Sequence, residues 1–128
     1  MKFLSDSHLL IWAAINSSRV PKRALPLLND KDNELFFSSA SLWEITVKAA
    51  AGRFDFQIDP RLLRRNLLDN GYQELPVTSE HALMLLTLPP IHKDPFDQML
   101  IAQAIAEGIT LLTSDATIAK YPGPIQKV

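Results

Sequence analysis

The chain has 128 residues, of which 47% are hydrophobic and 21% charged, and this is enough for one globular domain with a buried core. Thirteen basic and fourteen acidic residues give a formal net charge of -1, which argues against a protein that binds nucleic acid through bulk positive charge alone. The absence of cysteine excludes disulfides, thiolate zinc sites and cysteine nucleophiles.

Short apolar strands alternate with helices along the chain. The first half predicts a strand at 2–5, helices at 7–15 and 22–30, a strand at 35–37, and helices at 40–51 and 60–69. The second half predicts a strand at 74–77, helices at 78–88 and 96–107, a strand at 109–113, a short helix at 115–120 and a last strand at 125–128. This alternation is typical of a parallel α/β sheet.

Proline and glycine refine these elements. Pro26 weakens the helix at 22–30, because it removes a backbone donor from the expected helix interior. Pro76 cannot donate to a strand ladder, which places its strand at the periphery of the sheet. Gly108 follows the helix at 96–107 in the position where helices commonly end in a left-handed conformation.

No apolar run approaches the roughly 18 residues of a membrane-spanning helix. Asp6 interrupts the N-terminal segment before it can form the apolar stretch of a secretory signal. We therefore expect a cytoplasmic protein without membrane segments, folded as one domain over residues 1–128.

Acidic residues gather where the strands are expected to end. Asp6 directly follows the first strand, and Asp115 follows the strand at 109–113. Asp97 lies in the first turn of the helix before that strand, and Glu44 lies on the helix at 40–51. Because ligands bind outside the carboxyl ends of strands in an open parallel sheet, Asp6 and Asp115 fall at the binding edge, and Asp97 can reach it.

Each of these acids also has a structural explanation. Asp6, Asp94 and Asp115 are suited to cap helices, and an N-cap aspartate stabilises a helix by about 1 kcal/mol. Glu44 can form an ion pair with Lys48, one helical turn further on. Such a pair can also orient the Glu44 carboxylate for a functional role.

Asp97 begins the helical stripe that continues through Leu100, Ile101 and Ala104 and that we expect to face inward. A carboxylate there is unfavourable unless a cation meets it. Several carboxylates at one edge also repel one another, and a hard divalent cation with oxygen ligands supplies the counter-charge. The chemistry that these residues permit is metal-assisted phosphodiester hydrolysis.

Other residues give weaker signals. Glycine-rich phosphate loops, serine-hydrolase elbows and zinc-protease motifs are absent from the sequence, and we interpret His8, His81 and His92 as surface or packing residues. Residues 1–65 carry ten bases and seven acids, net +3, whereas residues 66–128 carry three bases and seven acids, net -4. The basic side chains are either solvated faces or a lip that positions a polyanion, and they are Arg19, Lys22, Arg23, Arg61, Arg64 and Arg65.

Four stretches surround the acids in order along nearly the whole chain: LSDSH at 4–8 with LIW at 10–12, SASLWEI at 39–45 with Lys48, HKDPFD at 92–97 with LIAQA at 100–104, and TSD at 113–115. Together they resemble the PIN-domain ribonucleases, and closely the VapC-type toxins of bacterial toxin–antitoxin pairs. The resemblance implies a Rossmann-like, three-layer α/β/α fold with a short parallel sheet of four to five strands.

The resemblance also implies that Asp6, Glu44, Asp97 and Asp115 form a catalytic pocket holding Mg²⁺ or Mn²⁺, with Asp6 and Asp97 as the principal metal carboxylates. Asp94 belongs to the subgroup signature His-x-Asp-Pro-Phe-Asp, and we interpret it as a cap beside the metal ligands. The implied activity is metal-dependent endonucleolytic cleavage of RNA. The implied partners are the RNA substrate, a cognate antitoxin and a second copy of the chain in a homodimer.

Two other functions are compatible with the residues. A receiver-like domain would accept a phosphoryl group at an acidic Mg²⁺ pocket, but it would need paired acids after the first strand, where Asp6 lies between two serines. A non-catalytic interaction module would use the acids only as helix caps. Trp12, residues 9–11 and the helix at 60–69 could form an apolar groove for an antitoxin, or they could be ordinary core.

Overall fold

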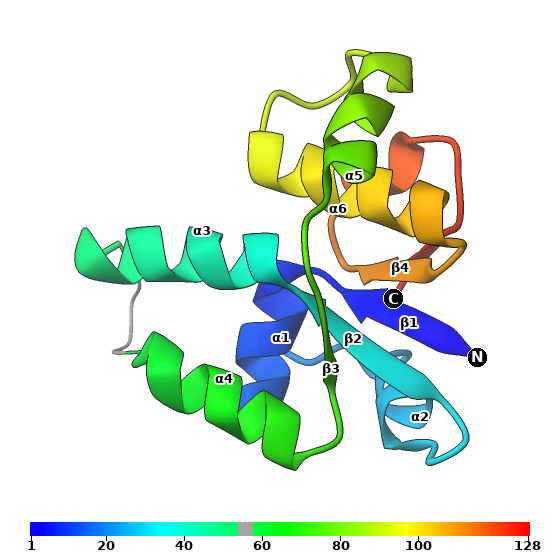
Figure 1. Ribbon diagram of the computed structural model, residues 1–128. Coiled ribbons are helices and arrows are strands. Elements are labelled where there is room, and N and C mark those ends of the chain that lie inside the picture. Colours follow the sequence, from blue (N-terminus) through cyan, green and yellow to red (C-terminus); the bar gives the residue numbers. More distant parts are fainter. Residues whose placement is uncertain (54–57) are drawn as a thin grey trace.

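A parallel sheet of five short strands forms the centre of the fold (Figure 1). The computed structural model describes residues 1–53 and 58–128. The strands are β1 (Lys2–Ser5), β2 (Glu34–Ser38), β3 (Gln73–Leu75), β4 (Thr110–Thr113) and β5 (Ile125–Lys127). Their order is β3-β2-β1-β4-β5, and all neighbouring strands are parallel. The strand predicted at 74–77 therefore lies at an edge of the sheet, as expected, but it ends at Leu75, so Pro76, which cannot donate to the ladder, is outside it.

The chain adds its strands to both sides of β1, which is therefore the central strand of the sheet. It adds β2 and β3 on one side of β1, and then β4 and β5 on the other. In register, Leu4 of β1 is paired with Phe36 of β2 and with Leu111 of β4. The carboxyl ends of β1 and β4 therefore lie side by side at the switch point, which is where open α/β sheets bind ligands.

Helices cover both faces of the sheet. They are α1 (Ser7–Ala14), α2 (Leu25–Asn29), α3 (Ser39–Ala50), α4 (Pro60–Asp69), α5 (Ser79–Met84) and α6 (Pro95–Glu107), with two 3₁₀-helices, η1 (Leu85–Thr87) and η2 (Ile118–Lys120). In Figure 1, α5 and α6 lie on one face and α1 and α2 on the other, while α3 extends past the end of the sheet. This arrangement confirms the predicted three-layer α/β fold.

Alternate strand residues bury their side chains in opposite layers. Leu4 and Leu111 pack with Ile101 of α6, whereas Phe3 and Leu112 belong to the cluster that α1 and α2 complete. Because β1 is covered on both faces, its last three residues are buried. A third cluster joins α1, α3 and α4, and its buried residues are Leu10, Ile11, Phe37, Ile45, Leu63 and Leu67.

Three predicted helices differ from the structure by more than one residue at an end. The helix expected at 22–30 is only α2, and it begins at Leu25 because Pro26 occupies the first turn, where its missing N–H is not needed. The helix expected at 78–88 tightens to η1 near its end, where Leu88 N donates to Leu85 O. The helix expected at 115–120 is reduced to η2, because residues 116 and 117 form a turn in which Thr117 N donates to Asp115 Oδ1.

Among the residues that the structure describes, no helix combines the length and the apolar character required to cross a membrane.

The end of α6 provides a test of backbone strain. Gly108 has φ of 66°, and a Cβ added to it would meet no atom within 4 Å, so a side chain there would meet strain but no clash. We expect Gly108→Ala to lower the free energy of unfolding by about 1 kcal/mol, and Gly108→Asn to lower it less. Urea denaturation measures both, and equal stability of Gly108→Ala and the wild type would contradict the assignment.

Candidate active site

Acidic side chains from four separate segments line one cavity of about 310 Å³. Asp6 follows β1, Glu44 lies on α3, Asp97 is in the first turn of α6 and Asp115 follows β4. Asp94 lines the same cavity, together with Ser7, His8, Trp12, Lys48, Ser114 and Ile118. The structure thus brings together all four acids of the predicted site, at the switch point between β1 and β4.

Asp6 is both a helix cap and a cavity residue. Its Oδ1 accepts a hydrogen bond from Leu9 N at 2.8 Å, which caps α1, and its Oδ2 accepts one from Thr113 Oγ1 at 2.6 Å. Burial raises the pKa of the Asp6 carboxyl, although these hydrogen bonds act in the opposite direction. The Thr113 bond also ties the end of β4 to the end of β1.

Glu44 is a buried carboxylate with a donor on each oxygen. Ser7 Oγ donates to its Oε1 at 2.7 Å, and the Lys48 ammonium donates to its Oε2. The Glu44 side chain is 4% exposed, so its ion pair differs from an ordinary surface pair between helical neighbours. The predicted Lys48 contact is therefore present, and it holds the carboxylate at the cavity wall.

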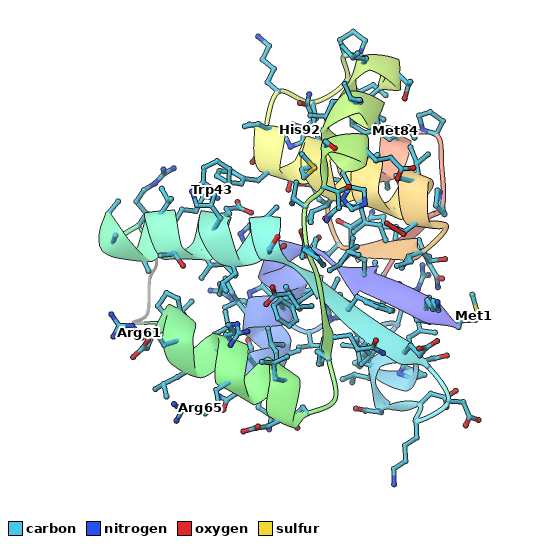
Figure 2. The ribbon with its side chains drawn as sticks, viewed as in Figure 1. Met1, Trp43, Arg61, Arg65, Met84 and His92 are labelled. Carbon is cyan, nitrogen blue, oxygen red and sulfur yellow. The ribbon has the colours of Figure 1, made fainter. Side chains whose placement is uncertain are left out.

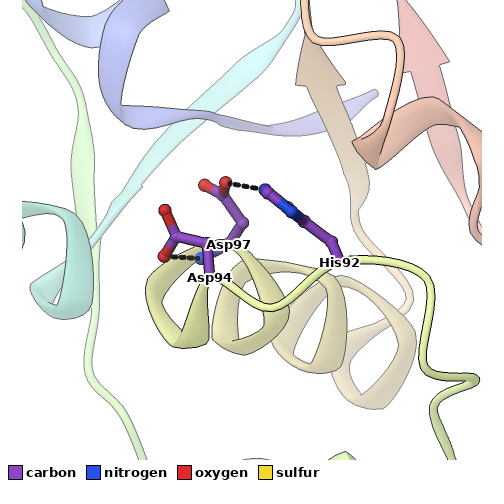
Figure 3. Close-up of side chains that lie close together, drawn as sticks. All are labelled: His92, Asp94 and Asp97. Carbon is purple, nitrogen blue, oxygen red and sulfur yellow. Dashed lines mark hydrogen bonds and ion pairs between the residues drawn. The ribbon is translucent and has the colours of Figure 1, made fainter.

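Asp97 lies at the start of α6, opposite the His92 imidazole (Figure 3). His92 Nε2 is 2.9 Å from Asp97 Oδ2. Burial, together with repulsion by Asp94 and Glu44, raises the pKa of Asp97 to about 7, even though the contact with His92 lowers it. The stripe that follows, Leu100, Ile101 and Ala104, is buried as expected.

Asp94 caps α6, and Asp115 binds the backbone of the turn that precedes η2. Asp94 Oδ1 accepts from Phe96 N at 2.9 Å, and Asp115 Oδ1 accepts from Thr117 N at 2.7 Å. With Asp6, three acids of the cavity thus accept from backbone N–H groups, and two of them, Asp6 and Asp94, do so at the starts of helices. Those positive helix ends partly offset the negative charge, so capping supports the acidic cluster.

Oxygen donors in this number fit a hard divalent cation. The cavity lining contains five carboxylates and, within residues 1–53 and 58–128, Lys48 as its single lysine or arginine. His92, Asp94 and Asp97 each present a ligand atom within 4.8 Å of the other two. The excess of negative charge in this lining, with oxygen atoms as the main donors, fits a hard divalent cation.

Sequence patterns do not predict several residues of the site. Ser7 and Thr113 adjoin predicted acids or strand ends, but nothing in the sequence shows that they donate to Glu44 and Asp6. His92, expected to be a surface or packing residue, instead contacts Asp97. Its position in the stretch HKDPFD, which also contains Asp94 and Asp97, is the sequence feature that points to this contact. His81, in contrast, is fully buried and completes the capping box of α5, so it is a packing residue as expected.

The six basic residues suggested as a lip for a polyanion are not among the described residues that line the acidic cavity. Arg61 and Arg64 line a different cavity, between α3 and α4, and Arg64 is paired with Glu74 at 3.3 Å. Arg61 and Arg65 lie on the outer side of α4 (Figure 2). Residues 9–11, suggested as part of an apolar groove, are buried in the core.

Residues 3–124 match the model of the PIN domain family. The chain belongs to this family. Its fold is similar to that of a chain in the crystal structure of VapBC2 from Rickettsia felis, which is bound to a DNA fragment from the VapBC2 promoter. The TM-score is 0.72 and the identity 14%, and the match covers 99% of this chain and 98% of that chain.

A chain of the DNA-bound VapBC from Salmonella typhimurium is similar as well, with a TM-score of 0.68, 18% identity and the same coverage of 99% and 98%. At these identities, the likeness establishes the fold. No curated protein sequence matches the chain significantly. The expected membership in the PIN family, with a VapC-like fold, is confirmed.

The raised pKa of Asp97 predicts how stability depends on pH in EDTA. The pKa of Asp97 is about 7 in the folded state, against an ordinary value of 3.8. The contribution of the Asp97 proton to the free energy of unfolding is therefore complete below about pH 4. It is lost as the pH rises through 7. We therefore expect Asp97→Asn to melt about 3 °C above the wild type at pH 8, and the difference to shrink toward pH 4.5.

Melting curves at several pH values, followed by circular dichroism, measure this difference. Asp32→Asn is the matched control, because Asp32 is an exposed acid outside the cavity and its substitution should leave the profile unchanged. A wild-type protein that is more stable than Asp97→Asn at pH 8 would contradict the repulsion of Asp97 by its acidic neighbours.

Proposed function

We propose that the chain is a divalent-metal-dependent endoribonuclease that acts as the toxin of a toxin–antitoxin pair. The observation that carries this proposal is the meeting of Asp6, Glu44, Asp97 and Asp115 in one cavity at the sheet switch point. Membership in the PIN domain family, whose members are generally nucleases, supports the hydrolytic reaction. The likeness to chains of VapBC structures supports the role as a toxin.

Asp6 and Asp97 are the principal residues that would hold Mg²⁺ or Mn²⁺, with Glu44 and Asp115 completing the acidic set. Asp97 Oδ2 is engaged by His92, which leaves its other oxygen for a ligand in the cavity. When bound, a divalent cation supplies Lewis-acid chemistry that offsets the negative charge developing on a phosphodiester during attack by water. Carboxylate ligands favour these hard ions over softer metals.

The protein residues provide orientation. Thr113 and the backbone of Leu9 fix the Asp6 carboxylate, so it is held in place before a ligand arrives. Ser7 and Lys48 fix Glu44 in the same way. Lys48 is half-buried at the cavity wall, where its ammonium can meet the anionic phosphate of an RNA strand.

We further propose a cognate antitoxin and a homodimer as partners, and the cytoplasm as the place of action. An antitoxin is supported by the VapBC assemblies in which similar folds occur. Helix caps alone, as in a non-catalytic module, would account for Asp6, Asp94 and Asp115, but they would not require the buried Glu44 in the same cavity.

Substitution of the acids tests this function directly. Asp6→Asn and Asp97→Asn should each lower the rate of RNA cleavage by more than about 100-fold and abolish growth arrest, because each removes a charged metal ligand but keeps the shape of the side chain. Cleavage of a labelled RNA in Mn²⁺ measures the rate, and circular dichroism confirms folding. Asp32→Asn is the control variant outside the cavity.

EDTA should stop cleavage by the wild type, and Mn²⁺ should restore it. Undiminished cleavage by a folded Asp6→Asn protein would exclude the proposed active site. An absence of cleavage by the wild type, with no effect of Mn²⁺ on its melting temperature, would favour the non-catalytic module.

A further inference from the structure

The loop between η1 and α6 has no regular secondary structure, yet its residue His92 is tightly held. His92 N donates to Tyr121 Oη at 2.7 Å, and Tyr121 Oη donates to His92 O at 3.2 Å. The Gln98 side-chain amide donates to the same carbonyl oxygen. The neighbours of His92, Ile91 and Lys93, are exposed, so these tertiary bonds fix the loop where packing does not.

The imidazole of His92 points at the acid in the first turn of α6. Its Nε2 lies 2.9 Å from Asp97 Oδ2. A dashed line marks this contact in Figure 3. A metal-binding carboxylate is ionised and only accepts hydrogen bonds, so in that state the imidazole nitrogen is the donor. Asp94 and Glu44 repel this carboxylate, and the His92 bond opposes a rotation that would carry it away from the cavity.

Tyr121 is a rigid anchor for this arrangement. It is 4% exposed and packs in the core cluster that contains Leu4, Ile101 and Leu111. It also ends the segment that begins with Asp115 and contains η2. One short segment therefore fixes Asp115 directly and reaches Asp97 through His92, which couples the positions of two acids from different parts of the chain.

We propose that Tyr121 and His92 are positioning residues that hold the Asp97 carboxylate in the orientation required for metal binding. Neither residue lines the acidic cavity among the described residues, and the His92 imidazole nitrogen that lies near Asp94 and Asp97 is bonded to Asp97, so we assign both residues to act through Asp97. The inference rests on the proposed metal-dependent function and adds a pair of residues to it. Partners of metal ligands commonly set affinity in this way, because they fix the ligand before the ion binds.

The test measures Mn²⁺ binding to the intact protein by titration calorimetry. Tyr121→Phe removes only the hydroxyl, and His92→Leu removes the donor to Asp97. Each should weaken Mn²⁺ binding by about 10-fold. His92→Gln places an amide donor at a similar reach and should stay within about threefold of the wild type. Tyr72→Phe is the matched control, because Tyr72 is a half-buried tyrosine in the cluster of α1, α3 and α4.

A double variant shows whether Tyr121 acts on Asp97 through His92, which we call the relay, or whether the two residues act independently. Because Tyr121 acts through His92, Tyr121→Phe combined with His92→Leu should lose no more affinity than His92→Leu alone. If the losses of Mn²⁺ affinity in the two single variants multiply in the double variant, the relay is excluded. Wild-type affinity in both single variants would overturn the inference and leave the proposed function intact. If Tyr121→Phe does not fold, the contrast between His92→Leu and His92→Gln decides the question.

A wild-type protein that binds no Mn²⁺ would overturn the metal dependence of the proposed function, and this inference with it. That result differs from the failure of the inference alone, in which the wild type binds Mn²⁺ and the variants bind it equally well.

Discussion

Electrostatic repulsion among carboxylates at the end of β1 is the constraint on which the rest of the site depends. Five acidic side chains share one cavity, and a single lysine faces them from the described lining. The fold meets this repulsion with donors: backbone N–H groups at helix starts, the hydroxyls of Ser7 and Thr113, the Lys48 ammonium and the His92 imidazole. These donors reduce the repulsion without removing it, since Asp94 and Glu44 still add to the effect of burial in raising the pKa of Asp97.

Structural and functional explanations of the same residues are therefore compatible here. Asp6 and Asp94 each cap a helix, and capping aims the positive end of that helix at the cavity. A site built in this way recovers part of the free energy that clustered acids would otherwise lose. It also explains why the caps lie at the carboxyl ends of strands, where helix starts and strand ends meet.

The acids are predictable from the sequence because each signal is local. Asp6 and Asp115 follow apolar runs that form strands, and Asp94-Pro95 marks the start of the helix that carries Asp97. The donors are less predictable. Tyr121 and His92 are 29 residues apart, and their contact depends on the tertiary path of the chain. The shortened α2 shows a further limit, because Pro26 has opposite effects in the first turn and in the interior of a helix.

The sheet order has a consequence for synthesis of the protein. The two central neighbours β1 and β4 are the first and the fourth strands to leave the ribosome, and the Asp6–Thr113 hydrogen bond joins residues 107 positions apart. A growing chain that ends before β4 carries Asp6, Glu44 and Asp97 without the strand that brings Asp115 beside them. The acidic cavity is therefore complete only in a chain that includes β4 and the Asp115 that follows it.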